Sequence, residues 1–126
     1  NYAGYANSTL GYHPYLNASQ QSKDTVDALA AARRAFATAS ATAGDKLFLT
    51  GYSQGGYVAM ATHRALQAAG TAVTASAPMS GPYALAAFGD ALFLGQVGNG
   101  AVANFTLLAT SYQRSYGTLW SSPGEV

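Results

Sequence analysis

The sequence contains, at residues 47–55, the stretch Leu47-Phe48-Leu49-Thr50-Gly51-Tyr52-Ser53-Gln54-Gly55. Its first residues form a short apolar run between turn residues, which is typical of a strand buried on both faces. A helical pattern rich in alanine follows from about Gln54 to Ala69, and Gly70 is placed to end it. The sequence therefore predicts a strand over 46–50 that passes through one tight turn directly into a helix.

Residues 51–55 also fit G-x-S-x-G, the nucleophile elbow, which requires a strand before it and a helix after it. In an elbow the serine takes strained backbone angles and exposes its hydroxyl at the head of the helix. Gly51 and Gly55 would leave the room that this turn needs. Ser53 is therefore the candidate catalytic nucleophile, and the backbone N–H of Gln54 is the candidate oxyanion-hole donor. A phosphate-binding loop or an inert turn is less favoured, because G-x-G-x-x-G is absent and no G-K-[ST] follows.

A serine needs a general base, and the sequence offers only two histidines. His63 lies ten residues after Ser53 on the same predicted helix, roughly 15 Å along its axis, which indicates a structural or surface role. His13 precedes Ser53, whereas elbow enzymes run serine, acid, histidine, so a pocket wall or a surface loop is favoured for it. Asp90 and Glu125 are the acids after Ser53, and Asp90 could serve only if its segment folded back. We expect the triad acid and histidine to lie outside these residues.

The remaining pattern predicts an α/β fold. The other expected elements are a loop over 1–18, a helix from Ser19 or Ser22 to Thr42, a strand over 71–77 that Pro78 ends, and helices over 84–94 and 101–113. The order helix, strand, helix, strand indicates a mostly parallel sheet with helices on both faces. We expect further strands before and after this sequence, because two strands cannot bury such a sheet. Residues 1–82 would form the central part of the core, and residues 83–126 part of a helical lid or cap.

Composition excludes several classes of protein. Charged residues make up only 9% of the chain, against roughly 25% in an average soluble protein. The net charge of +1 is too balanced for a nucleic-acid binder, and no apolar run approaches the length of a transmembrane span. The absence of cysteine excludes disulfides and Cys-ligated metal sites. A surface of Ser, Thr, Asn, Gln and Tyr favours a secreted or periplasmic protein, and the first residue, Asn1, indicates an internal or processed start.

Together these residues resemble the α/β-hydrolase superfamily, and within it bacterial secreted esterases and lipases of the secretory-lipase type. The resemblance rests on three stretches: Asn1-Tyr2-Ala3-Gly4-Tyr5 through His13-Pro14-Tyr15-Leu16, similar to a D-Y-x-G…H-P-Y-L loop; the strand, serine and helix over 47–61; and Ala75-Ser76-Ala77-Pro78-Met79-Ser80-Gly81-Pro82, similar to the end of the next strand. It implies that Ser53 is the nucleophile and that the Gln54 N–H is one oxyanion donor. The second donor would belong to a loop upstream of Asn1.

Aromatic residues suggest where a substrate would bind. Tyr2 and Tyr5 would wall the pocket or pack within their loop. Several further residues would either line an acyl pocket under a lid or form the helix core: Met79, Phe88, Phe93, Phe105, Tyr112, Tyr116 and Trp120. Low charge and many aromatic residues favour an uncharged, partly apolar ester, a small molecule or a lipid.

The sequence thus predicts a serine carboxylic-ester hydrolase, an esterase or lipase that acts through an acyl-enzyme on Ser53. No metal and no organic cofactor are expected. The remaining part of the same enzyme would complete the fold and the triad. Two alternatives stay open: a serine aminopeptidase of the same fold, and an inactive hydrolase fold used for binding.

Overall fold

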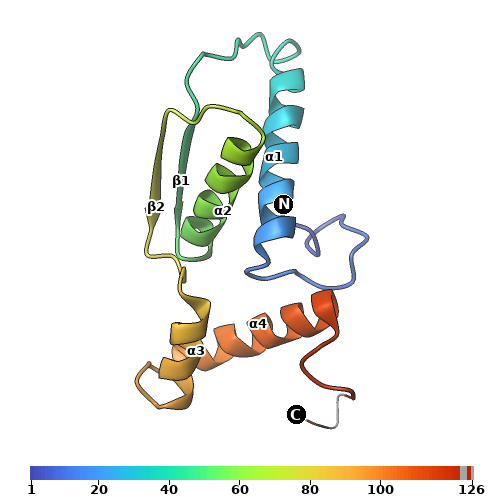
Figure 1. The fold of residues 1–126 in the computed structure, drawn as a ribbon. Helices are drawn as coiled ribbons and strands as arrows, with labels where there is room; N and C mark the ends of the chain where they lie inside the picture. The colour runs from blue at the N-terminus through green and yellow to red at the C-terminus, as the bar shows by residue number, and fades with distance from the viewer. Residues whose placement is uncertain (123–124, 126) are drawn as a thin grey trace.

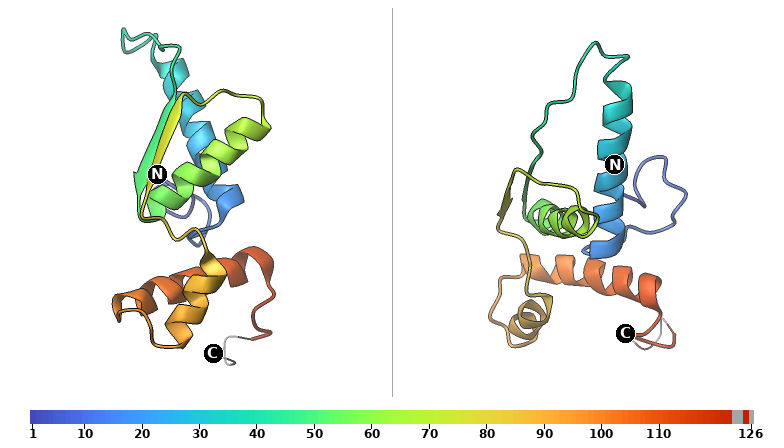
Figure 2. Two further views of the ribbon diagram at one scale, coloured as in Figure 1. Left: turned by 60° about the vertical axis from the view of Figure 1, so that its left-hand side comes forward. Right: turned by 45° about the horizontal axis from the view of Figure 1, so that its top comes forward.

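The computed structural model describes residues 1–122 and 125. In the order of the chain, the elements are α1 (Ala18–Ala35), β1 (Phe48–Tyr52), α2 (Gln54–Ala68), β2 (Ala75–Met79), α3 (Leu85–Phe93) and α4 (Gly100–Tyr116). Helix α2 packs against both strands, and α1 packs beside α2 (Figures 1 and 2). Both strands run toward α3 and α4, which lie beyond the carboxyl end of the sheet (Figure 1).

The two strands pair in parallel, as the order of elements predicted. Phe48 lies opposite Ala75 and Tyr52 opposite Met79. Both strands begin and end later than predicted: the first occupies 48–52 rather than 46–50, and the second occupies 75–79 rather than ending at Pro78. Pro78 does not end the second strand but lies within β2, opposite Gly51 of β1.

Burial alternates along both strands in the described residues, and the burial on both faces expected from further elements around the sheet stays a prediction. Leu49 is half-buried, whereas Phe48 and Tyr52 are 63% and 70% exposed. The reason is that α2 covers one face of the sheet and no described element covers the other. The first and last residues of β1 therefore leave their side chains uncovered.

Helix α1 begins and ends earlier than the sequence indicated. Its N-cap is Asn17, whose Oδ1 accepts a hydrogen bond from the Gln20 N–H at 3.1 Å, so neither Ser19 nor Ser22 has this role. The helix ends at Ala35 rather than Thr42. The following residues form a turn in which Ser40 has a φ of 51°, a conformation that a right-handed helix does not contain.

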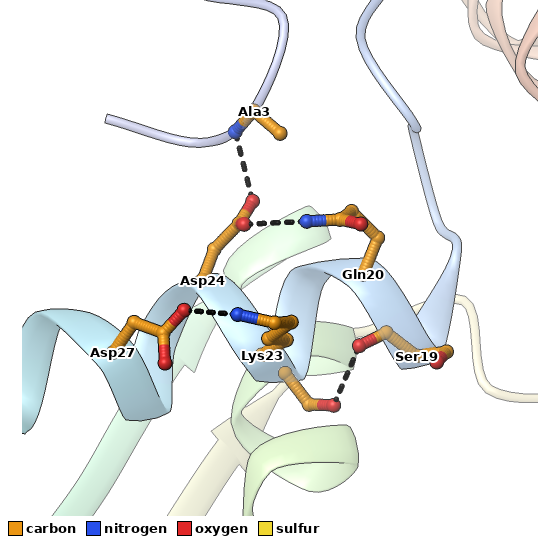
Figure 3. A network of polar contacts seen from close by, with 7 residues as sticks. Ala3, Ser19, Gln20, Lys23, Asp24 and Asp27 are labelled. Carbon is orange, nitrogen blue, oxygen red and sulfur yellow. Dashed lines mark hydrogen bonds and ion pairs between the residues drawn. The ribbon is translucent and has the colours of Figure 1, made fainter. Parts of the chain in front are cut away.

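The loop before α1 is held to that helix by a carboxylate. Figure 3 shows Asp24 accepting hydrogen bonds from the Ala3 N–H and from the Gln20 side chain, each at 2.8 Å. Lys23 pairs with Asp27 one turn along the same helix, but both side chains are well exposed and such a pair adds little stability. Asp24 is therefore the α1 carboxylate that fixes the start of the chain.

Helix α4 is joined to the same loop rather than to the sheet. The Tyr112 hydroxyl donates to the Leu16 carbonyl at 3.2 Å, and the Asn17 side chain donates to Ser115 Oγ at 3.2 Å. Helix α3 contacts α4 through Phe93 and Phe105. Their rings meet edge to face, with 5.2 Å between the ring centroids. None of the described helices is both long enough and apolar enough to cross a membrane. The division at residue 82 into core and cap stays a prediction.

Three tyrosines gather where α2 approaches α4. Tyr57 lies near Tyr112 and Tyr116 and shares with them the lining of one groove. Burial raises the pKa of Tyr57 to about 12, and the neighbouring phenol groups add to this increase. The folded state therefore holds the Tyr57 proton more tightly than the unfolded chain does.

We expect the free energy of unfolding to fall as the pH rises from about 10 to about 12, because the folded chain binds more protons than the unfolded chain in that interval. Below this interval the stabilisation is fully present. Urea unfolding of the full-length protein and of Tyr57→Phe across this range measures the effect. The Phe variant should show a shallower decline, and Tyr52→Phe, on the exposed face of the sheet, should match the wild type. Equal slopes for the Tyr57→Phe variant and the wild type would contradict this assignment.

Two glycines allow α2 to lie close to the strands. A Cβ at Gly51 would come 2.2 Å from the Gly55 carbonyl oxygen, and a Cβ at Gly56 would come 2.4 Å from the Met79 carbonyl oxygen. A Cβ at Gly55 would meet nothing within 4 Å. The role predicted for Gly51 is confirmed, whereas the second close approach belongs to Gly56 and not to Gly55.

Because of these contacts, alanine substitutions at Gly51, Gly55 and Gly56 should change the free energy of unfolding by different amounts. Gly51→Ala and Gly56→Ala should each lower the free energy of unfolding by about 1–3 kcal/mol, since a backbone carbonyl must move to admit the methyl group. Gly55→Ala is the matched control, and it should be neutral or stabilising by up to about 1 kcal/mol because Gly is a poor helix former. Urea unfolding of the three variants tests the ranking, and a Gly55→Ala loss as large as the other two would refute it.

Candidate active site

Ser53 lies at the reversal between β1 and α2. Its φ of 56° and ψ of −121° are rare for a residue with a side chain, and it is the N-cap residue of α2. The Ser53 N–H donates to the Met79 carbonyl at 3.0 Å, so the neighbouring strand supports the turn. The Ser53 side chain makes no capping hydrogen bond and the residue is exposed. The strand, turn and helix therefore have the geometry that the motif predicted.

A pocket of about 250 Å³ includes Ser53 in its lining. Its walls come from the loop before α1, the segment after β2, and helices α3 and α4. The other lining residues are Tyr15, Leu16, Ser80, Gly81, Pro82, Phe88, Asn104, Phe105 and Leu108. None of these side chains is charged, so the pocket suits an uncharged and partly apolar group.

Backbone strain is concentrated in this pocket. Five residues other than glycine have a positive φ in the described part of the chain, and three of them, Leu16, Ser53 and Ser80, belong to the pocket lining. Leu16 is the most unusual, because a bulky side chain is seldom found at a φ of 52° and this one is buried. Such strain persists only where surrounding contacts enforce it, and it tends to occur at functional sites.

Gln54 is the first residue of α2, so its backbone N–H has no acceptor within the helix. This N–H lies directly after Ser53 at the positive end of the helix dipole, where it can donate to a developing negative charge. The Gln54 side chain turns toward the loop before α1, and its Nε2 lies 2.9 Å from His13 Nε2. The oxyanion role of the Gln54 N–H stays a prediction.

Neither histidine is hydrogen-bonded to Ser53. His13 is 8% exposed and contacts Gln54 and the Ala3 carbonyl, so it is a buried residue beside the elbow rather than a surface loop residue. His63 is hydrogen-bonded to Ser76 Oγ at 2.9 Å across α2 and β2, which agrees with the structural role predicted for it. Both rings are thus engaged in contacts within the fold.

The two candidate acids lie outside the pocket lining. Asp90 is an exposed residue of α3, and the Glu125 carboxylate accepts hydrogen bonds from Ser121 and Ser122 in its own loop. Within residues 1–122 and 125, no three His, Asp or Glu side chains gather as a metal site would require. The triad acid and base predicted outside these residues stay a prediction.

The predicted aromatic lining is found in part. Phe88 and Phe105 line the Ser53 pocket. Tyr112 and Tyr116 line the groove beside α2, and Trp120 contributes to a third hollow behind α4. Tyr2 and Tyr5 lie against His13, with ring centroids 5.8 and 4.3 Å away. The substrate contact predicted for Tyr2 therefore stays a prediction.

Three residues of the pocket lining, Ser80, Asn104 and Leu108, were not expected from the sequence. Ser80 could have been found, because it directly follows a strand parallel to β1 and the carboxyl ends of parallel strands meet at one edge of a sheet. Asn104 and Leu108 lie one turn apart on α4, but no local signal indicates which face of that helix meets the core.

Solved structures of enzymes resemble this chain closely. The esterase LipA from Xanthomonas oryzae, described as degrading the rice cell wall, matches with a TM-score of 0.79 and 34% sequence identity, over 99% of this chain and 34% of the LipA chain. Its G231F mutant matches with a TM-score of 0.81 over the same shares. A candidate hydrolase from Legionella pneumophila matches with a TM-score of 0.80 and 29% identity, over 96% of this chain and 33% of that chain.

This chain thus spans about a third of the length of these solved structures. No family model matches it, and no curated protein matches it significantly. The TM-scores of 0.79 to 0.81 show that this chain shares the fold of the matching parts of these structures. The chain therefore has part of an esterase-type hydrolase fold, as its resemblance to the α/β-hydrolases predicted.

Proposed function

We propose that these residues supply the nucleophile of a serine carboxylic-ester hydrolase. One observation carries the proposal: Ser53 has a strained backbone and an exposed side chain at the head of α2, in the lining of an uncharged pocket. The likeness to the esterase LipA supports the same reaction class. Backbone strain of this kind tends to occur at functional sites, which favours a catalytic role over an inert turn.

In the proposed reaction, Ser53 Oγ attacks the ester carbonyl while a general base takes the hydroxyl proton. The Gln54 N–H donates a hydrogen bond to the oxyanion of the tetrahedral intermediate. The intermediate collapses, the C–O bond to the alcohol breaks, and the alcohol leaves with the proton from the base. Water then attacks the acyl-enzyme in the same manner, which releases the carboxylic acid and restores Ser53.

We place the base and its orienting acid outside residues 1–126. Both nitrogens of His13 and one nitrogen of His63 already have hydrogen-bonding partners within the fold. A general base must reach the serine hydroxyl within about 3 Å or through one water. The rest of the enzyme would then be the partner that completes the triad, with no cofactor in the reaction.

The pocket favours an uncharged ester substrate, a small molecule or the accessible end of a lipid. Its apolar side chains, Leu16, Phe88, Phe105 and Leu108, can contact an acyl chain. An aminopeptidase of the same fold would need a carboxylate to hold the substrate amino group, and neither Asp90 nor Glu125 belongs to the lining. We also propose that the protein is exported, because only 9% of its residues are charged and the surface relies on neutral polar side chains.

The full-length protein should hydrolyse a short-chain p-nitrophenyl ester, and Ser53→Ala should lower kcat by at least about 10³-fold. Ser40→Ala, at another serine with positive φ but outside the pocket lining, should keep the wild-type rate. Activity that survives in Ser53→Ala would refute the assignment. If Ser80→Ala lost activity instead, the nucleophile would be Ser80.

Assays of the same preparation distinguish the esterase from the two alternatives, an aminopeptidase and an inactive binding protein. An aminoacyl arylamide should be a poor substrate, and faster turnover of the arylamide than of the ester would favour the aminopeptidase. A protein that binds the ester with no turnover would favour the binding role.

A further inference from the structure

We infer that His13 is a positioning residue. Through one hydrogen bond, it holds Gln54 at a fixed distance from the wall of the Ser53 pocket. The inference rests on the function proposed above and adds a residue to that site. Sequence order disfavours His13 as the base, yet the structure buries it beside the elbow. A buried imidazole with defined partners on both nitrogens can fix the distance between two segments.

The partner of the first ring nitrogen, His13 Nδ1, belongs to the first residues of the chain. His13 Nδ1 lies 2.9 Å from the Ala3 carbonyl oxygen. The Ala3 N–H is itself held by Asp24 of α1, as Figure 3 shows. Because a carbonyl oxygen can only accept, Nδ1 must carry the ring proton. Asp24 of α1 therefore holds Ala3, and Ala3 in turn fixes the orientation of the His13 ring.

The second partner follows from the first. With the proton on Nδ1, the neutral ring has a lone pair at Nε2. Gln54 Nε2 lies 2.9 Å from this atom and donates to it, whereas Gln21 Nε2 is farther away at 3.4 Å. Gln54, the residue that follows the nucleophile, thus donates the better hydrogen bond to His13. It joins the loop before α1 to the head of α2, across 41 positions of sequence.

Aromatic packing keeps the ring in place. The Tyr5 ring lies 4.3 Å from the His13 ring, measured between centroids, and the Tyr2 and Tyr15 rings lie at 5.8 and 6.1 Å. These contacts oppose rotation of the imidazole away from Gln54. The fully buried Gln21 fills the space toward α1, and its Oε1 has no hydrogen-bonding partner in the described residues.

His13 also belongs to the segment that forms one wall of the pocket. Tyr15 and Leu16 follow it within three residues, and both line the pocket with Ser53. The strained φ of Leu16 needs fixed neighbours on either side. The bond from His13 to Gln54 therefore sets how far this wall stands from the nucleophile and from the Gln54 N–H. A misplacement of about 1 Å in such an arrangement can cost up to about 100-fold in rate.

Two substitutions of His13 distinguish the hydrogen bond at Nδ1 from the hydrogen bond at Nε2. His13→Asn keeps a donor near the Nδ1 position for Ala3 but has no atom near Nε2. His13→Gln places an amide oxygen near the Nε2 position, where it can accept from Gln54. In the full-length protein, we expect kcat for the p-nitrophenyl ester to fall about tenfold or more in the Asn variant, with KM little changed. The Gln variant should stay within about threefold of the wild-type kcat.

A double-variant cycle tests whether the effect passes through Gln54. Gln54→Met removes the amide donor and keeps the backbone N–H, so it should lower kcat about as much as His13→Asn does. Combining the two should add no further loss, because both remove the same bond. Gln21→Met is the matched control, since it removes the other amide near His13 and should leave kcat unchanged. All kcat values refer to the folded fraction, measured by urea unfolding of the same preparations.

The outcomes are distinct. Equal kcat for the Asn and Gln variants, losses that multiply in the double variant, or a Gln21→Met loss equal to that of Gln54→Met would each overturn the positioning role. Ser53→Ala is assayed in parallel. If the wild type shows no turnover that depends on Ser53, the proposed function itself fails, whatever the His13 variants do.

Discussion

The described structure depends on one backbone constraint, the reversal of the chain at Ser53. A positive φ in a residue with a side chain costs free energy, and neighbouring contacts must compensate for it. They do so in two ways. The Ser53 N–H bonds to Met79 of the adjacent strand, and Gly51 and Gly56 allow backbone carbonyls to approach closer than any side chain would permit. The turn, the pairing of β1 with β2 and the packing of α2 therefore depend on one another.

The same constraint places the candidate nucleophile. Because β1 turns directly into α2, the Ser53 side chain stands at the carboxyl edge of the sheet and at the positive end of a helix dipole. The parallel neighbour β2 ends at the same edge, which brings Ser80 and the residues after it into the pocket. Helices α3 and α4 cover this edge (Figure 2). A pocket at this place follows from parallel pairing alone, whereas its apolar lining follows from the covering helices.

The loop before α1 has a larger role than its composition indicates. Its residues look like an irregular stretch rich in Tyr and Asn, yet residues 13–17 are all buried. The loop accepts a hydrogen bond from α4 at Leu16, caps α1 with Asn17 and contacts α2 through His13. Three helices thus share one short segment as their common neighbour. Any change in this segment would reach the pocket wall, the cap and the elbow together.

The sequence by itself determined the elbow, the parallel pair of strands and the position of Ser53 in the turn, because these depend on local patterns: an apolar run, glycines at fixed offsets and a helical repeat. It also excluded His63 from the pocket, since rise along one helix is fixed. Strand limits were less accurate, because Pro78 does not end β2 but pairs in register with Gly51 of β1, and this pairing is a tertiary contact. Tertiary structure alone decided that His13 meets Gln54, that Leu16 is strained and that Asn104 faces the pocket. These facts depend on contacts between residues far apart in the chain, whose packing no local periodicity encodes.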